Sequence, residues 1–255
     1  MDVNSLKFDI CCAARLLYRL GLSVGVAGHL SVAVAENTML VNRFGPSFAT
    51  LTLADILTMD YSGKVLDHDA SVNPYVNETI QLHGVIHRYN PHIIAVAHTH
   101  PPATVTWTTF HKVPEIFDQE GCLLADDIAI VDDEFTGLAS SEDRVRPFAE
   151  ALGIKPVVLL PNHGAITTGP SIQHALFRMM LLEGACQRNI AVASAAKATG
   201  LTPHAIASEH ALTAKRELAR IPIVENLWED LLKRLRHSDP DLFSKASEMA
   251  FAGGN

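Results

Sequence analysis

Apolar residues recur with a helical period at the start of the chain. They stand at Leu6, Ile10, Ala13, Leu17 and Leu20. Residues three or four apart share one face of a helix, and Asn4 or Ser5 can cap its beginning while Gly21 can end it. The pattern predicts an amphipathic helix over about residues 5–20 that packs on a core.

Short β-branched runs separated by turn residues follow this helix. Residues 25–34 join a glycine-containing loop to a strand, and residues 39–42 form its partner after a turn at Glu36-Asn37. Residues 52–55 have the composition of a capping box at the beginning of a short helix, and a third strand follows over residues 57–60. Strands joined by such short turns are expected to be antiparallel.

Helices and strands alternate through the rest of the chain. We predict helices over 77–89, from 101, over 141–152, 171–198 and 224–235, and strands over about 93–98, 128–131, 157–160 and 165–169. This order favours an α/β fold with a mixed, mostly antiparallel sheet over a doubly wound parallel one. No linker-like composition divides the chain, so we expect a single domain over residues 1–255 with a C-terminal helical extension from about residue 203.

Composition and charge restrict the function. The 255 residues are 48% hydrophobic and carry a formal net charge of -8, with no run of basic residues. Nucleic acid or an anionic membrane is therefore a poor partner, and a small-molecule substrate is the better hypothesis. The start of the chain lacks the basic segment and following apolar segment of a signal peptide, and no apolar stretch reaches the roughly 20 residues of a membrane span. We therefore expect a cytoplasmic protein. The four cysteines are too sparse for a disulfide framework and are expected to be buried thiols.

Three histidines suggest a metal site. His98 and His100 end an apolar strand one residue apart, and side chains at positions i and i+2 of a strand project to the same face. His163 follows another apolar run, residues 157–160, and is the candidate third ligand. Three protein ligands leave one coordination position open, which is the catalytic arrangement of zinc-like metals.

Other polar residues are candidates for proton transfer and substrate binding. Glu78, at a helix start, is either an acid/base or a carboxylate that complements the helix dipole. His29 beside Gly28 can bind a substrate carboxylate or act as a second acid/base, and the alternative is a solvent-facing loop histidine. Asn42 and Arg43 are candidate clamps for an anionic substrate.

A second histidine pair competes for the metal assignment. His83 and His87 lie four residues apart on one helical face. No third ligand and no HExxH glutamate accompany them, so the pattern favours a structural role.

Taken together, four features resemble the class II aldolase/adducin family. They are the glycine loop over 25–31, a glutamate upstream of a helix, the His98-Thr99-His100 pair and the Asn162-His163-Gly164 turn, and the resemblance covers roughly residues 5–200. The resemblance implies a three-layer α/β/α sandwich and a homotetramer with active sites near subunit interfaces. It also implies one divalent ion per chain, with zinc as the first choice and manganese or another divalent ion as the alternative. His98, His100 and His163 match the family's metal ligands, and Glu78 matches its acid/base.

The chain departs from the sugar-phosphate members where they bind phosphate. Val76 and Asn77 stand where those members carry two serines, and His29 stands where they carry an asparagine. The adducin-like branch, which includes decarboxylases of hydroxylated aromatic dicarboxylates, is the closer resemblance. We predict a metal-dependent carbon–carbon lyase acting through an enolate-like species, aldolase type, with a decarboxylase of a hydroxylated carboxylate as the alternative. Epimerisation and a non-catalytic adducin-like interaction domain are further alternatives, and the retained histidines argue against the last.

Overall fold

A central mixed sheet organises the molecule in a computed structural model that describes residues 2–131, 137 and 140–244. Within these residues the sheet has eight strands in the order β4-β3-β2-β1-β5-β8-β7-β6. The strands are β1 (His29–Ala35), β2 (Thr38–Asn42), β3 (Ile56–Asp60), β4 (Val65–Asp67), β5 (Ala95–Thr99), β6 (Ile128–Ile130), β7 (Val157–Leu160) and β8 (Gly164–Gly169). Only β6 and β7 pair in parallel, so the prediction of a mostly antiparallel sheet is confirmed.

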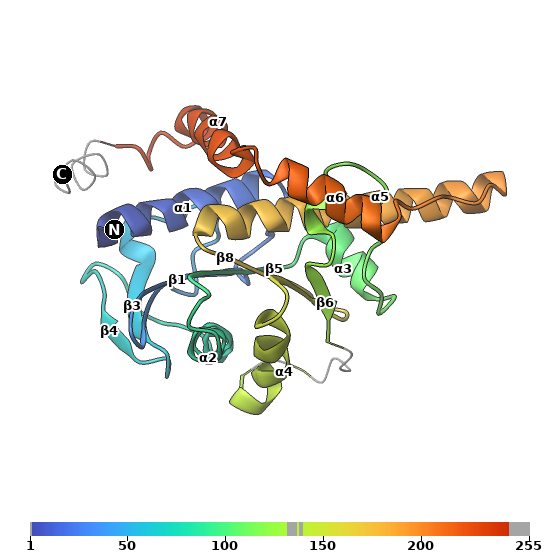
Figure 1. Cartoon of the computed structure of the whole chain (residues 1–255). Coiled ribbons are helices and arrows are strands. Elements are labelled where there is room, and N and C mark those ends of the chain that lie inside the picture. The colour runs from blue at the N-terminus through green and yellow to red at the C-terminus, as the bar shows by residue number, and fades with distance from the viewer. Residues whose placement is uncertain (1, 132–136, 138–139, 245–255) are drawn as a thin grey trace.

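Helices cover both faces of the sheet (Figure 1). The α-helices are α1 (Val3–Arg19), α2 (Gln81–Tyr89), α3 (Pro102–Thr108), α4 (Glu142–Leu152), α5 (Ile172–Thr199), α6 (Ser208–Leu218) and α7 (Ile223–Ser238). Three short 3-10 helices join them, η1 (Leu53–Asp55), η2 (Glu78–Ile80) and η3 (Gly121–Leu124). Helices α1, α5 and α7 lie on one side of the sheet and α2 and α4 on the other, which gives the three-layer sandwich that the family resemblance implied.

The alternation of β5 shows why two cores form. Ala95 and Ala97 are fully buried in the cluster that includes residues of α1 and α5, whereas Val96 is buried with residues of α2 and α4. Successive side chains of a strand point to opposite faces, so this central strand contributes apolar surface to both layers. By the same alternation, His98 belongs to the α2 and α4 side.

The end of α7 is tied back to α1 by buried charges. The Arg15 guanidinium donates to Asp239 at 2.9 Å, and both side chains are almost fully buried. Arg19 adds a second bond to Asp239 at 2.8 Å. These bonds fix Asp239, the C-cap of α7, against α1, and α7 packs on the first helix of the chain.

Most predicted elements are present, and the differences have local causes. The helix expected over 77–89 begins as the 3-10 helix η2 and becomes α-helical only at Gln81. Helix α6, η3 and β4 were not predicted. Only Ala211 of α6 is buried, so this helix shows little of the apolar period that reveals a helix in sequence.

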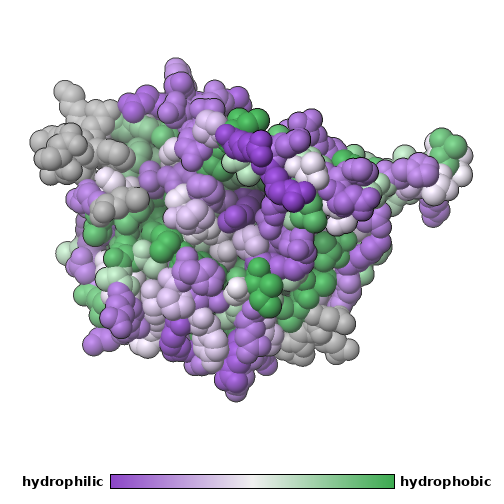
Figure 2. All heavy atoms as spheres, viewed as in Figure 1, coloured by the Kyte–Doolittle hydropathy of each residue, from purple (hydrophilic) through white to green (hydrophobic). Residues whose placement is uncertain are grey.

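Helix α5 extends beyond the body of the molecule. Residues 191–200 are mostly exposed, and the chain returns along this projecting end before α6 (Figure 1). Figure 2 shows hydrophilic and hydrophobic residues side by side on the projecting end. In the described part of the chain, the helices are all too short or too polar to cross a membrane. The four cysteines are buried free thiols, as predicted.

Candidate metal centre

His98 is placed by the middle of the sheet. It lies in β5, opposite Ile166 of β8 on one side and His29 of β1 on the other. Its Nδ1–H donates to the carbonyl oxygen of Ala165 at 3.0 Å. Because a carbonyl only accepts, this bond leaves the lone pair of the neutral ring on Nε2, the form in which histidine binds a metal.

His100 lies between the end of β5 and the beginning of α3, where a buried carboxylate fixes the chain. Glu183 of α5 is 4% exposed and accepts the backbone N–H groups of Ala103 at 2.9 Å and Thr104 at 2.8 Å, together with the Thr104 hydroxyl. A carboxylate at a helix N-terminus satisfies unpaired N–H groups and complements the helix dipole. Sequence reasoning missed Glu183, whose available signal was an acidic residue within the apolar first half of α5.

His163 is placed by the tight turn between β7 and β8. Asn162, directly before it, has a φ of 55°, the left-handed conformation that asparagine tolerates better than most residues. Gly164, directly after it, has no room for a side chain, since an added Cβ would lie 2.5 Å from the Thr99 carbonyl oxygen and 2.8 Å from His100 Cδ2. The absence of a Cβ at Gly164 lets the turn approach β5 closely enough for His163 to meet the other two histidines.

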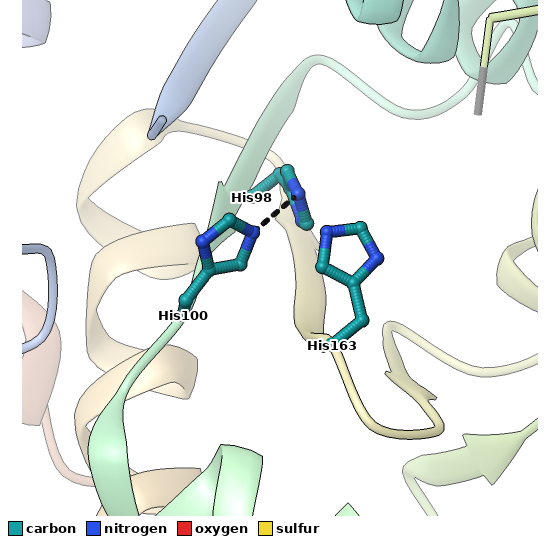
Figure 3. Close-up of side chains that lie close together, drawn as sticks. All are labelled: His98, His100 and His163. Atoms are coloured by element: carbon teal, nitrogen blue, oxygen red, sulfur yellow. Dashed lines mark hydrogen bonds between the residues drawn. The ribbon is translucent and has the colours of Figure 1, made fainter. Parts of the chain in front are cut away.

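The three imidazoles converge (Figure 3). One ligand nitrogen from each of His98, His100 and His163 lies within 4.8 Å of the others, and Nε2 of His98 and Nε2 of His100 are 3.2 Å apart. The ring centroids are separated by 4.7 to 5.0 Å. The prediction that these histidines meet is therefore confirmed.

The protonation of these rings suits a divalent cation. Burial lowers the pKa of His98 well below its ordinary value, and burial with the neighbouring His100 lowers the pKa of His163 to about 4. Burial also lowers the pKa of His100. Neutral imidazoles are the metal-binding form, and three nitrogen donors of borderline softness fit zinc or a related ion with a coordination position left open.

His29 lies beside the triad and not in solvent. It is 5% exposed, and its ring centroid is 5.8 Å from that of His98. Burial, followed by the charges of His100 and His163, lowers its pKa to about 4. Its Nε2 is 3.4 Å from the hydroxyl of Thr79, the residue after Glu78. The alternative of a solvent-facing loop histidine was wrong, because His29 begins β1 in register with His98.

Glu78 is exposed at the beginning of η2, and among the described residues the metal-binding group contains only the three histidines. Glu78 is adjacent in sequence to Thr79, whose hydroxyl lies 3.4 Å from His29 Nε2. Its role as acid/base stays a prediction.

Asn42 and Arg43 both have partners inside the chain. Asn42 accepts the Leu30 N–H at 2.7 Å and donates to the Gly28 carbonyl at 3.2 Å, so its side chain holds the glycine loop against β1. Arg43 donates to Asp55 at 2.7 Å. The Asn42 contacts shape the glycine loop, and binding of substrate by Gly28, Asn42 and Arg43 stays a prediction.

His83 and His87 form a separate group. Ser31 Oγ lies 2.6 Å from His83 Nδ1 and 2.8 Å from His87 Nε2. Both rings are at most 1% exposed. A serine hydroxyl between them excludes a metal bridge through these nitrogens, in agreement with the structural role that the sequence favoured.

Comparison with known proteins relates the whole arrangement to one family. Residues 8–190 match the sequence profile of the Class II Aldolase and Adducin N-terminal domain. The chain is 30% identical over 241 residues to decarboxylase NovR of Streptomyces niveus, covering 93% of this chain and 86% of that protein. It is 29% identical over 194 residues to 3,4-dihydroxyphthalate decarboxylase of Arthrobacter keyseri, covering 73% of this chain and 78% of that protein. The solved structure of L-fuculose 1-phosphate aldolase from Glaciozyma antarctica PI12 has the same fold, with a TM-score of 0.82 at 24% identity over 95% of this chain and 92% of that one.

Proposed function

The chain belongs to the class II aldolase and adducin family and is a metal-dependent lyase. We propose that it decarboxylates a small hydroxylated carboxylate, and that an aromatic carboxylate is the preferred substrate. The observation that carries this proposal is the buried His29 in register with His98. It occupies the position where the sugar-phosphate members carry an asparagine. The names of the two decarboxylases above support the same choice of reaction.

The residues around the triad have separate tasks in this proposal. His98, His100 and His163 hold the divalent ion, which supplies a Lewis acid that stabilises negative charge developing on a substrate oxygen. Neutral His29 takes the proton of the substrate hydroxyl and returns it to the carbon from which carbon dioxide leaves. The electron pair of the broken carbon–carbon bond becomes the new carbon–hydrogen bond, and a solvent proton restores the hydroxyl.

Aldol cleavage is the second candidate, and it uses the same site. It also breaks a carbon–carbon bond through an enolate-like species, so the open metal position and Glu78 serve either reaction. The surroundings of Gly28 favour decarboxylation over cleavage of a sugar phosphate. Asn42 is bonded to the glycine loop and Arg43 to Asp55, so fewer donors are free to bind a phosphate.

Product analysis tests the proposal. Metal-loaded protein is incubated with separate panels of hydroxylated aromatic carboxylates, aliphatic hydroxy acids and sugar aldols, and carbon dioxide and aldehyde are measured independently. We expect carbon dioxide without aldehyde from the aromatic panel. Aldehyde without carbon dioxide would replace decarboxylation by aldol cleavage, and a racemised substrate with neither product would indicate epimerisation.

Glu78 is tested by the isosteric substitution Glu78→Gln. The carboxylate is exposed and outside the triad, so metal content should stay at the wild-type level. If Glu78 moves a proton, turnover falls by about two orders of magnitude or more. Unchanged turnover would remove Glu78 from the reaction and leave His29 as the proton carrier.

Zinc as the native ion and a homotetramer are further proposals, and a cytoplasmic location stays a prediction. The exposed projecting end of α5 supports self-association, because it offers residues 191–200 as a contact surface away from the core of its own chain. Light scattering of the wild type and of a chain with Val192 and Leu201 replaced by glutamate tests whether this end holds the oligomer together.

A further inference from the structure

A row of buried polar groups lies between β1 and α2, behind the candidate metal centre. Starting at the triad, it consists of His29, His83, Ser31 and His87, and it ends at the backbone carbonyl of Ile93. Each of the three histidines is at least nine-tenths buried. Gly84 makes this packing possible, since a Cβ there would lie 2.1 Å from the Tyr61 carbonyl oxygen.

The hydrogen bonds of this row have a single consistent direction. His87 Nδ1 lies 3.1 Å from the Ile93 carbonyl oxygen, which can only accept, so Nδ1 carries the proton. Burial lowers the pKa of His87 to about 4, so the ring is neutral and its Nε2 accepts the hydroxyl hydrogen of Ser31. The Ser31 oxygen then accepts from Nδ1–H of His83. Consequently, the lone pair of His83 is on Nε2.

The row is incomplete at its inner end. Among the described residues, His83 Nε2 and His29 Nδ1 are both buried without a hydrogen-bond partner. The two rings meet edge to face, with centroids 5.7 Å apart. Nε2 of His83 is an acceptor, so it lacks a hydrogen-bond donor.

We propose that His83 is a positioning residue that accepts the Nδ1–H of His29, directly or through a single buried water. His29 then keeps its lone pair on Nε2, the nitrogen on the side of Thr79 and η2. The opposite tautomer of His29 would gain only a 3.4 Å contact with Thr79 and would place two buried lone pairs next to each other. The inference rests on the proposed function in one respect, because it assigns the nitrogen with which His29 takes the substrate proton.

The tautomers themselves are the first test, and they require no activity. Long-range proton–nitrogen correlation spectra of metal-free protein labelled with nitrogen-15 histidine distinguish Nδ1–H from Nε2–H rings, and single substitutions assign the signals. We expect His29, His83 and His87 all as neutral Nδ1–H tautomers at pH 7.5. A Nε2–H tautomer at His83 or at His29 would overturn the proposal, whatever reaction the protein catalyses.

Two substitutions at His83 separate positioning from packing. Asparagine can donate to Ser31 as Nδ1 does but has no group at the place of Nε2, whereas glutamine can present an acceptor there. We expect His83→Asn to lower kcat about 100-fold with KM and metal content unchanged, and His83→Gln to keep kcat within about tenfold of the wild type. Folded, metal-loaded His83→Asn with wild-type kcat would overturn the proposal. His92→Asn, at an exposed position after α2, is the matched control.

A double-variant cycle tests whether His83 acts through His29. If it does, His83→Asn causes no further loss of kcat in a His29→Ala background, because the group that it positions is gone. Losses that multiply would show that His83 contributes independently and would overturn the proposal. A protein without lyase activity would refute the proposed function while the spectra still decide the tautomers.

Discussion

Two groups of histidines, the triad and the pair His83 and His87, lie on the same side of the same sheet. They differ in what lies between their ring nitrogens. In the triad, the ligand nitrogens of His98, His100 and His163 converge within 4.8 Å, and Nε2 of His98 and Nε2 of His100 are 3.2 Å apart. In the second group, the Ser31 hydroxyl lies between His83 and His87 and satisfies one nitrogen of each. A buried imidazole lone pair needs a partner. The triad is therefore suited to a cation, whereas the second group is completed largely by the protein itself.

The largest effect should come from removing a triad ligand. His98→Ala takes away the ring that Ala165 holds in its metal-binding tautomer. Metal affinity and kcat should both fall by more than the roughly 10–100-fold typical of losing an outer partner of a ligand. Metal content after dialysis and turnover measure the two effects. His87→Ala, in the second group, should keep one ion per chain, and equal metal loss in both variants would erase the distinction between the groups.

Acid should affect the second group through stability. Burial lowers the pKa of His87 to about 4, whereas an unfolded histidine titrates near 6.5. Between these values the unfolded chain binds a proton that the folded chain excludes, so stability falls as the pH drops from about 6.5 to about 4. This one residue contributes up to roughly 3 kcal/mol of that loss. Urea unfolding of metal-free wild type and His87→Gln across this range should give a shallower pH dependence for the variant, and parallel curves would contradict the neutral buried ring.

The turn that places His163 should be sensitive to a single methyl group. In Gly164→Ala the new Cβ would overlap the Thr99 carbonyl oxygen and the His100 ring. We expect metal affinity to fall about 10–100-fold, because both neighbouring ligands shift. Gly184→Ala in α5, where the nearest atom would be 3.6 Å away, is the matched control and should bind metal normally. Equal affinities in the two variants would show that the turn does not set the ligand geometry.

The smallest effect should come from Glu183, which acts on His100 through the beginning of α3. Glu183→Gln replaces one carboxylate oxygen, which accepts a backbone N–H, by an NH2 group that cannot accept it. Unfolding free energy should fall by about 1–3 kcal/mol, with a smaller loss of metal affinity than in Gly164→Ala. Chemical denaturation and metal titration measure both effects. Gln187→Ala, which removes only a 3.3 Å contact to the same carboxylate, should be close to neutral.

The sequence predicted the triad but not most of its supports. The i, i+2 spacing of His98 and His100 is local, and His163 was found because it follows a second apolar run, residues 157–160. Ser31, in contrast, is one residue of a β-branched strand whose partners lie 52 and 56 residues further along the chain. Glu183 meets α3 about 80 residues earlier. Such contacts depend on how the layers pack, so neither periodicity nor spacing reveals them.

The fold shows the same division. Strongly periodic segments such as α1, and the hairpin of β1 and β2, were predicted near their observed bounds. Helix α6 buries only Ala211 fully, and it was missed because a single buried position gives no clear apolar period. The burial of His29 was left open for a related reason, since a strand residue becomes buried only when a helix, here α2, covers its face.

We expect the metal ion at the triad and not at the second group. The most direct measurement is a zinc titration of metal-free protein, followed through the imidazole nitrogen signals of all the histidines. We expect the signals of His98, His100 and His163 to change together and to saturate at one ion per chain, while those of His83 and His87 keep their Nδ1–H tautomers. Saturation at the His83 and His87 signals, or no saturable change at the triad, would contradict it.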